Sequence, residues 1–269
     1  MIEIKKAYID INSGQIHYRY SEGIGLPLIL FHRTPSSSVM YERMMHEYRG
    51  KRPIYAIDTP GFGSSFDPEG MPSINNYRDW LCETIDTLDI DKFHIYAHHT
   101  GTHFAAEIAL LWPKRVLSLA LNGAAYFSKE ERELFFKNFT PVPKPDMNGE
   151  YLHERFTLIK SLFPTFNPEL VNLELIGGLR SIDGRNQAFA SLEEQDFASA
   201  LRQVECPILV MSAVNDFFID KLEIIKKDIP SARIAELGKT LIASPELDTK
   251  KTVKLLNDFI TDTELQARV

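Results

Sequence analysis

The sequence has little cysteine, no excess of positive charge and no long apolar run. Its two cysteines, Cys82 and Cys206, are too few and too far apart for a disulfide framework. With a net charge of −7 there is no basic excess to neutralise phosphates, which argues against non-specific nucleic-acid binding. No apolar run approaches the ~20 residues that a membrane helix needs. We therefore expect a globular protein that binds neither nucleic acid nor membrane.

The expected compartment follows from the same features. Residues 1–6 lack the apolar core of a signal peptide, and two free thiols fit a reducing compartment. We therefore expect a cytoplasmic protein, for which a homodimer stays open as the assembly.

Strand-like and helix-like segments alternate over residues 1–123 and 204–269. Runs of apolar or β-branched residues predict strands at 7–11, 15–20, 26–31, 53–57, 93–96, 116–122, 207–213 and 232–237. Strands that alternate with helices imply a mostly parallel sheet covered on both faces. The sequence thus predicts an α/β fold built on an eight-stranded sheet.

Residues 124–203 interrupt this rhythm, because they carry helical patterns and no convincing strand. The expected helices are 128–139, 151–162, 168–176 and 192–204. We predict an inserted helical cap (124–203) between two core segments (1–123 and 204–269). Most of its aromatic side chains should pack in its core, and a few should line an apolar ligand chamber.

A sharp turn from strand to helix is expected at residues 96–101. Ala97, His99 and Gly101 have the small-x-X-x-Gly spacing of a nucleophile elbow, whose middle side chain is exposed at the top of a sheet. The middle residue is usually serine, and here it is His99. His32-Arg33, Asp58 and Asp216 also follow predicted strands, so we expect all of these residues near one crevice at the carboxyl ends of the strands.

These segments together resemble the α/β-hydrolase superfamily, in the branch with a helical cap. Residues 58–65 (DTPGFGSS) are similar to its D-x-P-G-x-G-x-S segment, and residues 32–35 (HRTP) resemble its H-G-x-P oxyanion loop with Arg33 in place of glycine. The resemblance puts the acid of the catalytic triad at Asp216 and the catalytic histidine near Thr240. H-x-T-P together with H-H-T-G also resembles an atypical subgroup with histidine at the elbow.

Two of the three members of that family's Ser-His-Asp triad are absent. The elbow serine is replaced by His99, and none of the eight histidines lies beyond His153. A serine-type acyl-enzyme mechanism is therefore not available at this elbow. We predict that His99 is a general acid or base, or less favourably a covalent nucleophile, and that Asp216 orients it. The opposing interpretation of His99 is a decayed site that merely tolerates a histidine. The opposing interpretation of Asp216 is a helix N-cap or a loop carboxylate.

The predicted oxyanion and substrate-binding residues are His32, Arg33, Thr34, His98, Thr100 and Asn122. The N–H groups of Arg33 and Thr100 would form an oxyanion hole, as the resemblance implies. The Arg33 guanidinium would bind a carboxylate or enolate, or else point to solvent. For His32 and Asn122 a structural role is favoured, and for His98 packing and support of His99 are equally open.

A metal site is conceivable because His99 and His103 are four residues apart. However, no H-E-x-x-H pattern or carboxylate ligand set accompanies them, and residue 103 should lie a full turn down a packed helix. We predict no metal and no cofactor.

The sequence thus favours an enzyme that performs cofactor-free acid–base chemistry on a small organic carbonyl compound. Hydrolysis, C–C cleavage, and lyase or cyclase reactions all fit. A different class stays open, namely a small-molecule-binding protein that kept the pocket and lost the triad. A third option is ordinary ester hydrolysis through Ser64, Ser65 or Thr100.

Overall fold

The structure is a computed structural model that describes residues 3–48, 50–139, 145–163 and 165–267. The remaining residues, 140–144 and 164 of the predicted cap among them, lie outside this description. Within the described ranges, no helix has the length and apolar character to cross a membrane.

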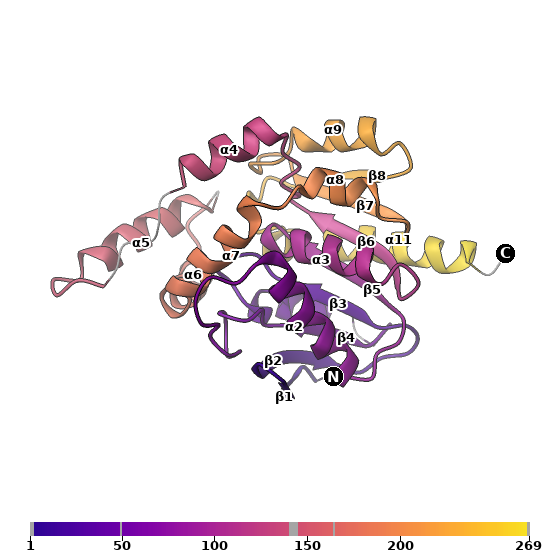
Figure 1. The fold of residues 1–269 in the computed structure, drawn as a ribbon, viewed down its shortest axis with the longest axis horizontal. Helices are drawn as coiled ribbons and strands as arrows, with labels where there is room; N and C mark the ends of the chain where they lie inside the picture. The colour runs from indigo at the N-terminus through magenta and orange to yellow at the C-terminus, as the bar shows by residue number, and fades with distance from the viewer. Residues whose placement is uncertain (1–2, 49, 140–144, 164, 268–269) are drawn as a thin grey trace.

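An eight-stranded sheet forms the centre of the molecule (Figure 1). Its order is β1-β2-β4-β3-β5-β6-β7-β8; β2 is antiparallel to both β1 and β4, and the other neighbouring strands are parallel to each other. This confirms the predicted fold class. The strands are β1 (Lys5–Ile11), β2 (Gly14–Ser21), β3 (Leu28–Phe31), β4 (Ile54–Ile57), β5 (Phe93–His98), β6 (Val116–Asn122), β7 (Ile208–Ala213) and β8 (Arg233–Leu237).

Helices cover both faces of the sheet, and each face has its own apolar core. Successive side chains of a strand point to opposite faces, so Ile29 and Phe31 of β3 pack in one core while Leu28 and Leu30 pack in the other. The second core is covered by η1 (Ser38–Tyr41), α1 (Glu42–Tyr48) and α11 (Thr249–Gln266). The first is covered by α2 (Ile74–Thr87), α3 (Thr100–Leu111), α7 (Ile182–Glu193), α8 (Phe197–Arg202) and α9 (Lys221–Asp228). A short helix, α10 (Ser244–Leu247), precedes α11.

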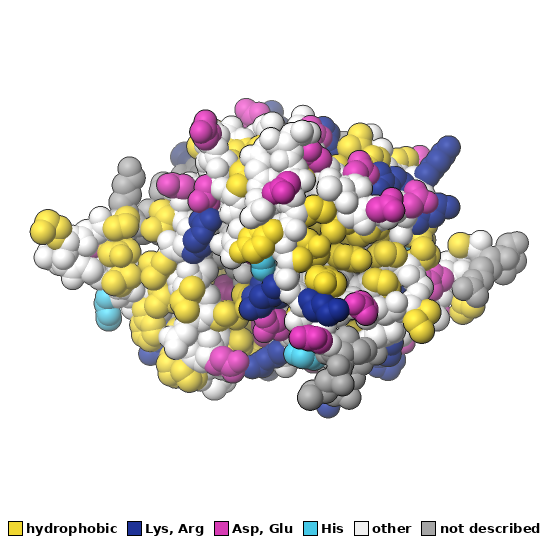
Figure 2. Space-filling model, turned by 90° about the horizontal axis from the view of Figure 1, so that it is seen from below, with side chains coloured by type: hydrophobic (Ala, Val, Ile, Leu, Met, Phe, Trp, Pro, Cys, Tyr) yellow, Lys and Arg dark blue, Asp and Glu magenta, His cyan; other side chains and the backbone are white. Residues whose placement is uncertain are grey.

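In the described residues between β6 and β7 there are five helices, which we call the helical insertion. They are α4 (Lys129–Lys137), α5 (Glu150–Ser161), α6 (Pro168–Arg180), α7 and α8. Helices α4 and α5 project beyond the sheet (Figure 1). Hydrophobic side chains gather on the surface at the end formed by α5 and α6 (Figure 2), where Leu158 and Ile176 are exposed.

The sequence-based expectation of one helix at 192–204 was wrong. Two helices, α7 and α8, occupy residues 182–202. The buried face of α7 consists mainly of small and polar residues, such as Gly184, Gln187 and Ser191, so it lacks an apolar period. Gly184 is required there, because a Cβ would collide with the carbonyl oxygen of Gly61 in the 58–65 loop.

Candidate active site

His99 alone separates β5 from α3 and forms the tip of the turn. Its φ of 46° and ψ of −114° are unusual for a residue with a side chain and store backbone strain. The turn is held by the His99 N–H, which donates to Asn122 O (2.9 Å), and by His99 O, which accepts from the Thr102 hydroxyl (2.6 Å). Gly101 lets α3 approach β3, since a Cβ would lie 2.5 Å from Phe31 O. The chain therefore builds a strained elbow around a histidine.

The elbow imidazole is hydrogen-bonded to a buried carboxylate. His99 Nε2 lies 2.8 Å from Asp216 Oδ2, and the other carboxylate oxygen accepts the Phe218 N–H at 3.0 Å. Asp216 is fully buried, whereas 13% of the His99 side chain is exposed. Gly123 makes the contact possible, because a Cβ there would overlap His99 Nε2.

The contact with Asp216 assigns the proton on the neutral His99 ring. A carboxylate accepts, so Nε2 carries the hydrogen and Nδ1 carries the lone pair. In the part of the chain that the structure describes, Nδ1 has no hydrogen-bond partner. Relative to a Ser-His-Asp triad, in which Nδ1 faces the acid and Nε2 takes the proton, the two nitrogens have exchanged positions.

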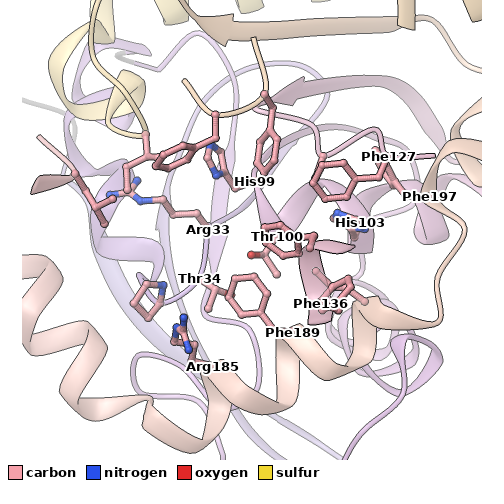
Figure 3. A pocket seen from close by; sticks show the side chains of 18 of the residues that line it. Arg33, Thr34, His99, Thr100, His103, Phe127, Phe136, Arg185, Phe189 and Phe197 are labelled. Atoms are coloured by element: carbon pink, nitrogen blue, oxygen red, sulfur yellow. The ribbon is translucent and has the colours of Figure 1, made fainter. Parts of the chain in front are cut away.

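A cavity of about 520 Å³ lies beside His99, between the sheet and the helical insertion (Figure 3). Its walls are mainly apolar, with aromatic rings from the insertion and from the loop after β7. Of the predicted site residues, Arg33, Thr34, His99 and Thr100 line it. Asp216 reaches it only through His99. Such a chamber suits a small organic ligand.

The side chain of Arg33 does not point to solvent, and its charge is paired within the protein. Its guanidinium is buried and donates to Glu174 (2.9 Å) of α6 and to Glu246 (2.8 Å) of α10. Burial opposes its charge, but the two carboxylates outweigh burial and raise the pKa of Arg33. Burial raises the pKa of Glu246 in spite of Arg33. Both alternatives for this side chain are therefore corrected, because Arg33 connects the loop after β3 to the insertion and to α10.

The predicted residues His32, Asn122 and, as described below, His98 do not line the cavity. His32 Nε2 accepts the Thr59 N–H (3.0 Å) and Nδ1 donates to Arg33 O (2.9 Å), so this ring holds two loops together. Asn122 donates to the Tyr96 hydroxyl. These two contacts match the structural interpretation that the sequence favoured.

His98 packs against His99 rather than facing the cavity. The two rings meet edge to face, with centroids 4.6 Å apart. Burial, with the charges of His99 and Arg33, holds the pKa of His98 well below its usual range, so this ring is neutral. Both of its nitrogens lack a hydrogen-bond partner among the described residues.

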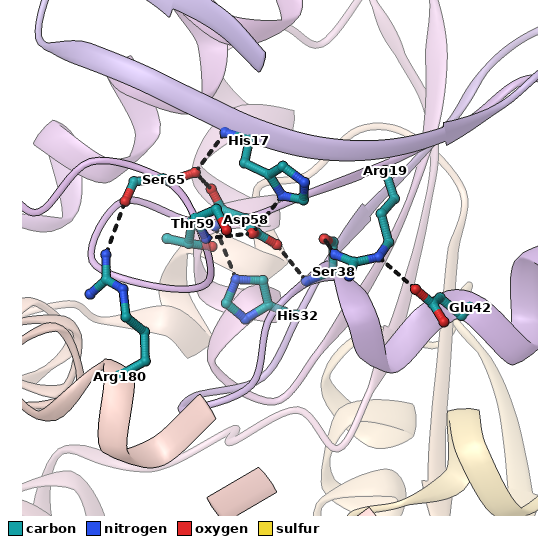
Figure 4. A network of polar contacts seen from close by, with 10 residues as sticks. His17, Arg19, His32, Ser38, Glu42, Asp58, Thr59, Ser65 and Arg180 are labelled. Atoms are coloured by element: carbon teal, nitrogen blue, oxygen red, sulfur yellow. Dashed lines mark hydrogen bonds and ion pairs between the residues drawn. The ribbon is translucent and has the colours of Figure 1, made fainter. Parts of the chain in front are cut away.

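Asp58 belongs to a separate buried network (Figure 4). It contacts His17 Nδ1 (2.8 Å) and accepts the N–H groups of Ser38 (2.7 Å) and Ser64 (2.9 Å). Burial raises its pKa, but these hydrogen bonds outweigh burial and bring the pKa to about 2. Ser65 donates to Asp58 O, and neither Ser64 nor Ser65 lines the cavity. The expectation that Asp58 shares the crevice with His99 was therefore wrong.

The loop where the superfamily has its catalytic histidine is closed by other contacts. Thr240 is buried and its hydroxyl donates to Ser244, while the Leu241 N–H donates to Asn215.

Among the described residues, one cluster has the composition of a metal site. His98, His99 and Asp216 each offer a ligand atom, and these atoms lie within 4.8 Å of one another. A proton between Nε2 and Oδ2 already explains the contact of His99 with Asp216, so no ion is needed to account for it.

Six polar residues of the cavity wall were not identified as site residues from the sequence. They are His103, Arg132, Arg155, Glu174, Arg185 and Gln195. His103 was expected to be packed away, but its ring lies on the wall and contacts Gln195 at 2.5 Å. Burial, partly offset by Gln195, lowers the pKa of His103 to about 4. The three arginines come from the insertion, where no motif marks them.

Comparison with known proteins places this geometry in a family. The model of the alpha/beta hydrolase fold family matches residues 27–238, and the chain belongs to that family. An uncharacterised hydrolase of Saccharomyces cerevisiae is 27% identical over 261 residues, which cover 84% of this chain and 87% of that protein. An (E)-2-((N-methylformamido)methylene)succinate hydrolase of Acinetobacter baylyi is 23% identical over 208 residues, or 76% of this chain and 78% of that one.

Solved structures show the same fold. The crystal structure of the enol-lactonase from Burkholderia xenovorans LB400 matches with a TM-score of 0.79 at 18% identity, covering 95% of this chain and 100% of that one. The family and the relatives named as hydrolases identify the chain as an α/β-hydrolase-fold enzyme of the hydrolase type.

Proposed function

We propose that this enzyme works without a Ser-His-Asp triad and uses His99 for cofactor-free acid–base chemistry on a small organic carbonyl compound. The observation that carries the proposal is the strained elbow that presents His99 at the cavity wall, with Nε2 on the buried Asp216 and Nδ1 available. Strain of about 1–3 kcal/mol at a residue in this backbone conformation is typical of functional sites.

In the hydrolytic form of the reaction, His99 Nδ1 takes a proton from water while the water oxygen attacks the substrate carbonyl. The N–H groups of Arg33 and Thr100 stabilise the oxyanion. Thr100 is the first residue of α3, where N–H groups have no intrahelical acceptor. Asp216 stabilises the imidazolium, which then returns the proton to the leaving group.

The same groups can serve C–C cleavage, decarboxylation, dehydration or cyclisation, because each needs one proton moved beside a stabilised oxyanion or enolate. The hydrolase names of the relatives support hydrolysis first. We further propose that residues 124–203 act as a cap that covers the chamber.

The test is a turnover screen of esters, enol-lactones, epoxides and β-diketones, followed by His99→Ala on the best substrate. We expect a loss of about 10²–10⁴-fold in kcat/KM, the usual contribution of a general acid–base group. His153→Ala changes an exposed histidine of α5 and should leave turnover unchanged. Unchanged turnover in His99→Ala would refute the proposal.

Two further outcomes distinguish the alternatives. Labelling by an organophosphonate would support a hydroxyl nucleophile, and Thr100 is the one of the three candidate hydroxyls that lines the cavity. No turnover across the screen, together with a ligand that raises Tm, would favour a binding protein.

A further inference from the structure

Among the described residues, one buried guanidinium of the helical insertion lies in the cavity wall without a salt-bridge partner. Arg155 of α5 is 6% exposed, and its Nε lacks a hydrogen-bond partner among the described residues. Within the same part of the chain, no carboxylate lies within ion-pair distance of it. Gly178 of α6 leaves space for this group, since a Cβ there would lie 2.9 Å from one Nη of Arg155 and 3.0 Å from its Nε. Two helices thus accommodate an incompletely satisfied cation beside an apolar chamber.

A second guanidinium lies close enough to Arg155 to feel its charge. Arg185 of α7 packs on the rings of Phe139 (4.5 Å) and Phe189 (5.2 Å), and it lines the cavity, as Figure 3 shows. Burial, and after it the positive charge of Arg155, lowers the pKa of Arg185 to about 10. Bringing two like charges together in an apolar wall is unfavourable unless an anion joins them.

Arg33 differs from Arg155 in that the fold pairs its guanidinium with carboxylates, although the Nε of each lacks a hydrogen-bond partner among the described residues. It contacts one carboxylate from α6 and one from α10. Glu174 also attracts Arg155 electrostatically, but it hydrogen-bonds Arg33. The wall therefore has room for one more carboxylate, and the planar fork of arginine matches that group in two parallel hydrogen bonds.

We propose that the cavity binds substrates that carry a carboxylate, and that Arg155 and Arg185 hold this carboxylate beneath the insertion while the reacting carbonyl lies at His99. The position of the carbonyl rests on the function proposed above, whereas the binding of the carboxylate does not require turnover.

Calorimetric titration tests the carboxylate site directly. The probes are 4-oxo-4-phenylbutanoate, 5-oxo-5-phenylpentanoate and 6-oxo-6-phenylhexanoate, each compared with its methyl ester. We expect at least one acid to bind about tenfold or more tightly than its ester, because hydrogen bonds to charged groups are strong. Equal affinity of acid and ester, or no binding of any acid, overturns the proposal.

Variants then assign the site. Arg155→Gln and Arg185→Gln should each weaken binding of the acid about tenfold or more and leave the ester unchanged. Arg180→Gln is the matched control, because Arg180 lies on α6 but pairs with Asp67 outside the cavity. Arg155→Met should have a Tm no lower than that of the parent protein, since it removes an incompletely paired buried charge; this checks that lost binding is not lost folding. Unchanged affinity in both glutamine variants overturns the assignment.

His99→Gln separates this inference from the function on which it builds. Retained binding of the acid with lost turnover supports both. If His99→Gln retains both binding and turnover, the proposed role of His99 is refuted and the carboxylate site is still supported. If the acid and its ester bind equally and turnover still depends on His99, only the carboxylate site is refuted.

Discussion

Among the described residues, two histidine–aspartate pairs have the same 2.8 Å contact, His17–Asp58 and His99–Asp216. Asp58 receives two backbone N–H groups in addition to its histidine, and His17 is almost fully buried. Asp216 receives one such N–H, and His99 keeps a free nitrogen at the cavity wall. The contact itself therefore does not define a site. A pair that lies away from the cavity and binds the N–H groups of neighbouring loops holds those loops together, whereas a pair with an open nitrogen at the cavity wall can move a proton.

The largest expected difference between the pairs is in stability. Asp58→Ala should lower the free energy of unfolding by about 3–5 kcal/mol, because it leaves buried donors unsatisfied. Urea denaturation followed by circular dichroism measures this. Asp258→Ala, at an exposed pair with Lys254, should change it by under about 1 kcal/mol. A similar loss in both variants would remove the structural role of the His17–Asp58 pair.

Asp216→Asn should have the opposite profile. It preserves the shape of the side chain but no longer stabilises an imidazolium, so kcat should fall about 100-fold or more while stability changes little. Steady-state kinetics and urea denaturation of the same preparation test this. A large loss of stability with unchanged kcat would make the two pairs equivalent.

Gly123→Ala tests the His99–Asp216 pair by adding one Cβ atom beside the His99 ring. The added Cβ would displace the His99 ring, and we expect kcat to fall about tenfold. Gly70→Ala is the matched control, because Gly70 has the same φ of +66° and no atom near the position of a Cβ. Both variants should lose about 1 kcal/mol of stability from the backbone, and only Gly123→Ala should lose activity. Equal kinetics would show that His99 has room to move.

As the pH falls, protonation of His103 should destabilise the protein before protonation of Asp58 does. The pKa of His103 is about 4 in the folded protein and 6.5 when unperturbed, so its stabilising effect is complete above pH 6.5 and is lost as the pH falls toward 4. The slope should be about 1.4 kcal/mol per pH unit for such a group. The contribution of Asp58, with a pKa of about 2, is lost only below about pH 3.8.

Urea denaturation at several pH values checks this order. His103→Gln should reduce the slope between pH 6.5 and 4, to which His94 with its pKa of about 4 also contributes, and leave the part below pH 3.8 unchanged. A flat profile above pH 4 in the parent protein would contradict it.

Much of the fold was visible in the sequence, because its strands and elbow are encoded locally. The continuous apolar runs gave the buried strands, and Ala97, His99 and Gly101 gave the turn. Helix α7 was missed because its buried face is small and polar, as Gly184 and Ser191 show.

From the sequence, site residues could be predicted only where they belong to a recognisable motif. The order of the strands brings Asp216 to His99. The spacing of the elbow had already indicated His99, and the family resemblance had indicated Asp216. The partners of Arg33 are 141 and 213 residues away, so no local pattern reveals that it is neutralised. Arg155 and Arg185 lie on helices whose arrangement over the sheet is a tertiary property. Their sequence neighbourhoods resemble those of any solvated arginine.

The two hydrogen-bond partners of the Asp216 carboxylate limit how mutation can change the chemistry of this enzyme. Each oxygen is already engaged, one by His99 and the other by the Phe218 N–H. A mutation that introduces histidine at Thr240 would meet an occupied acid, and His99→Ser alone would leave a serine without a base. If His99 moves the proton, as proposed above, a change to the serine mechanism by single mutations passes through an enzyme with neither chemistry, and such a change is therefore disfavoured.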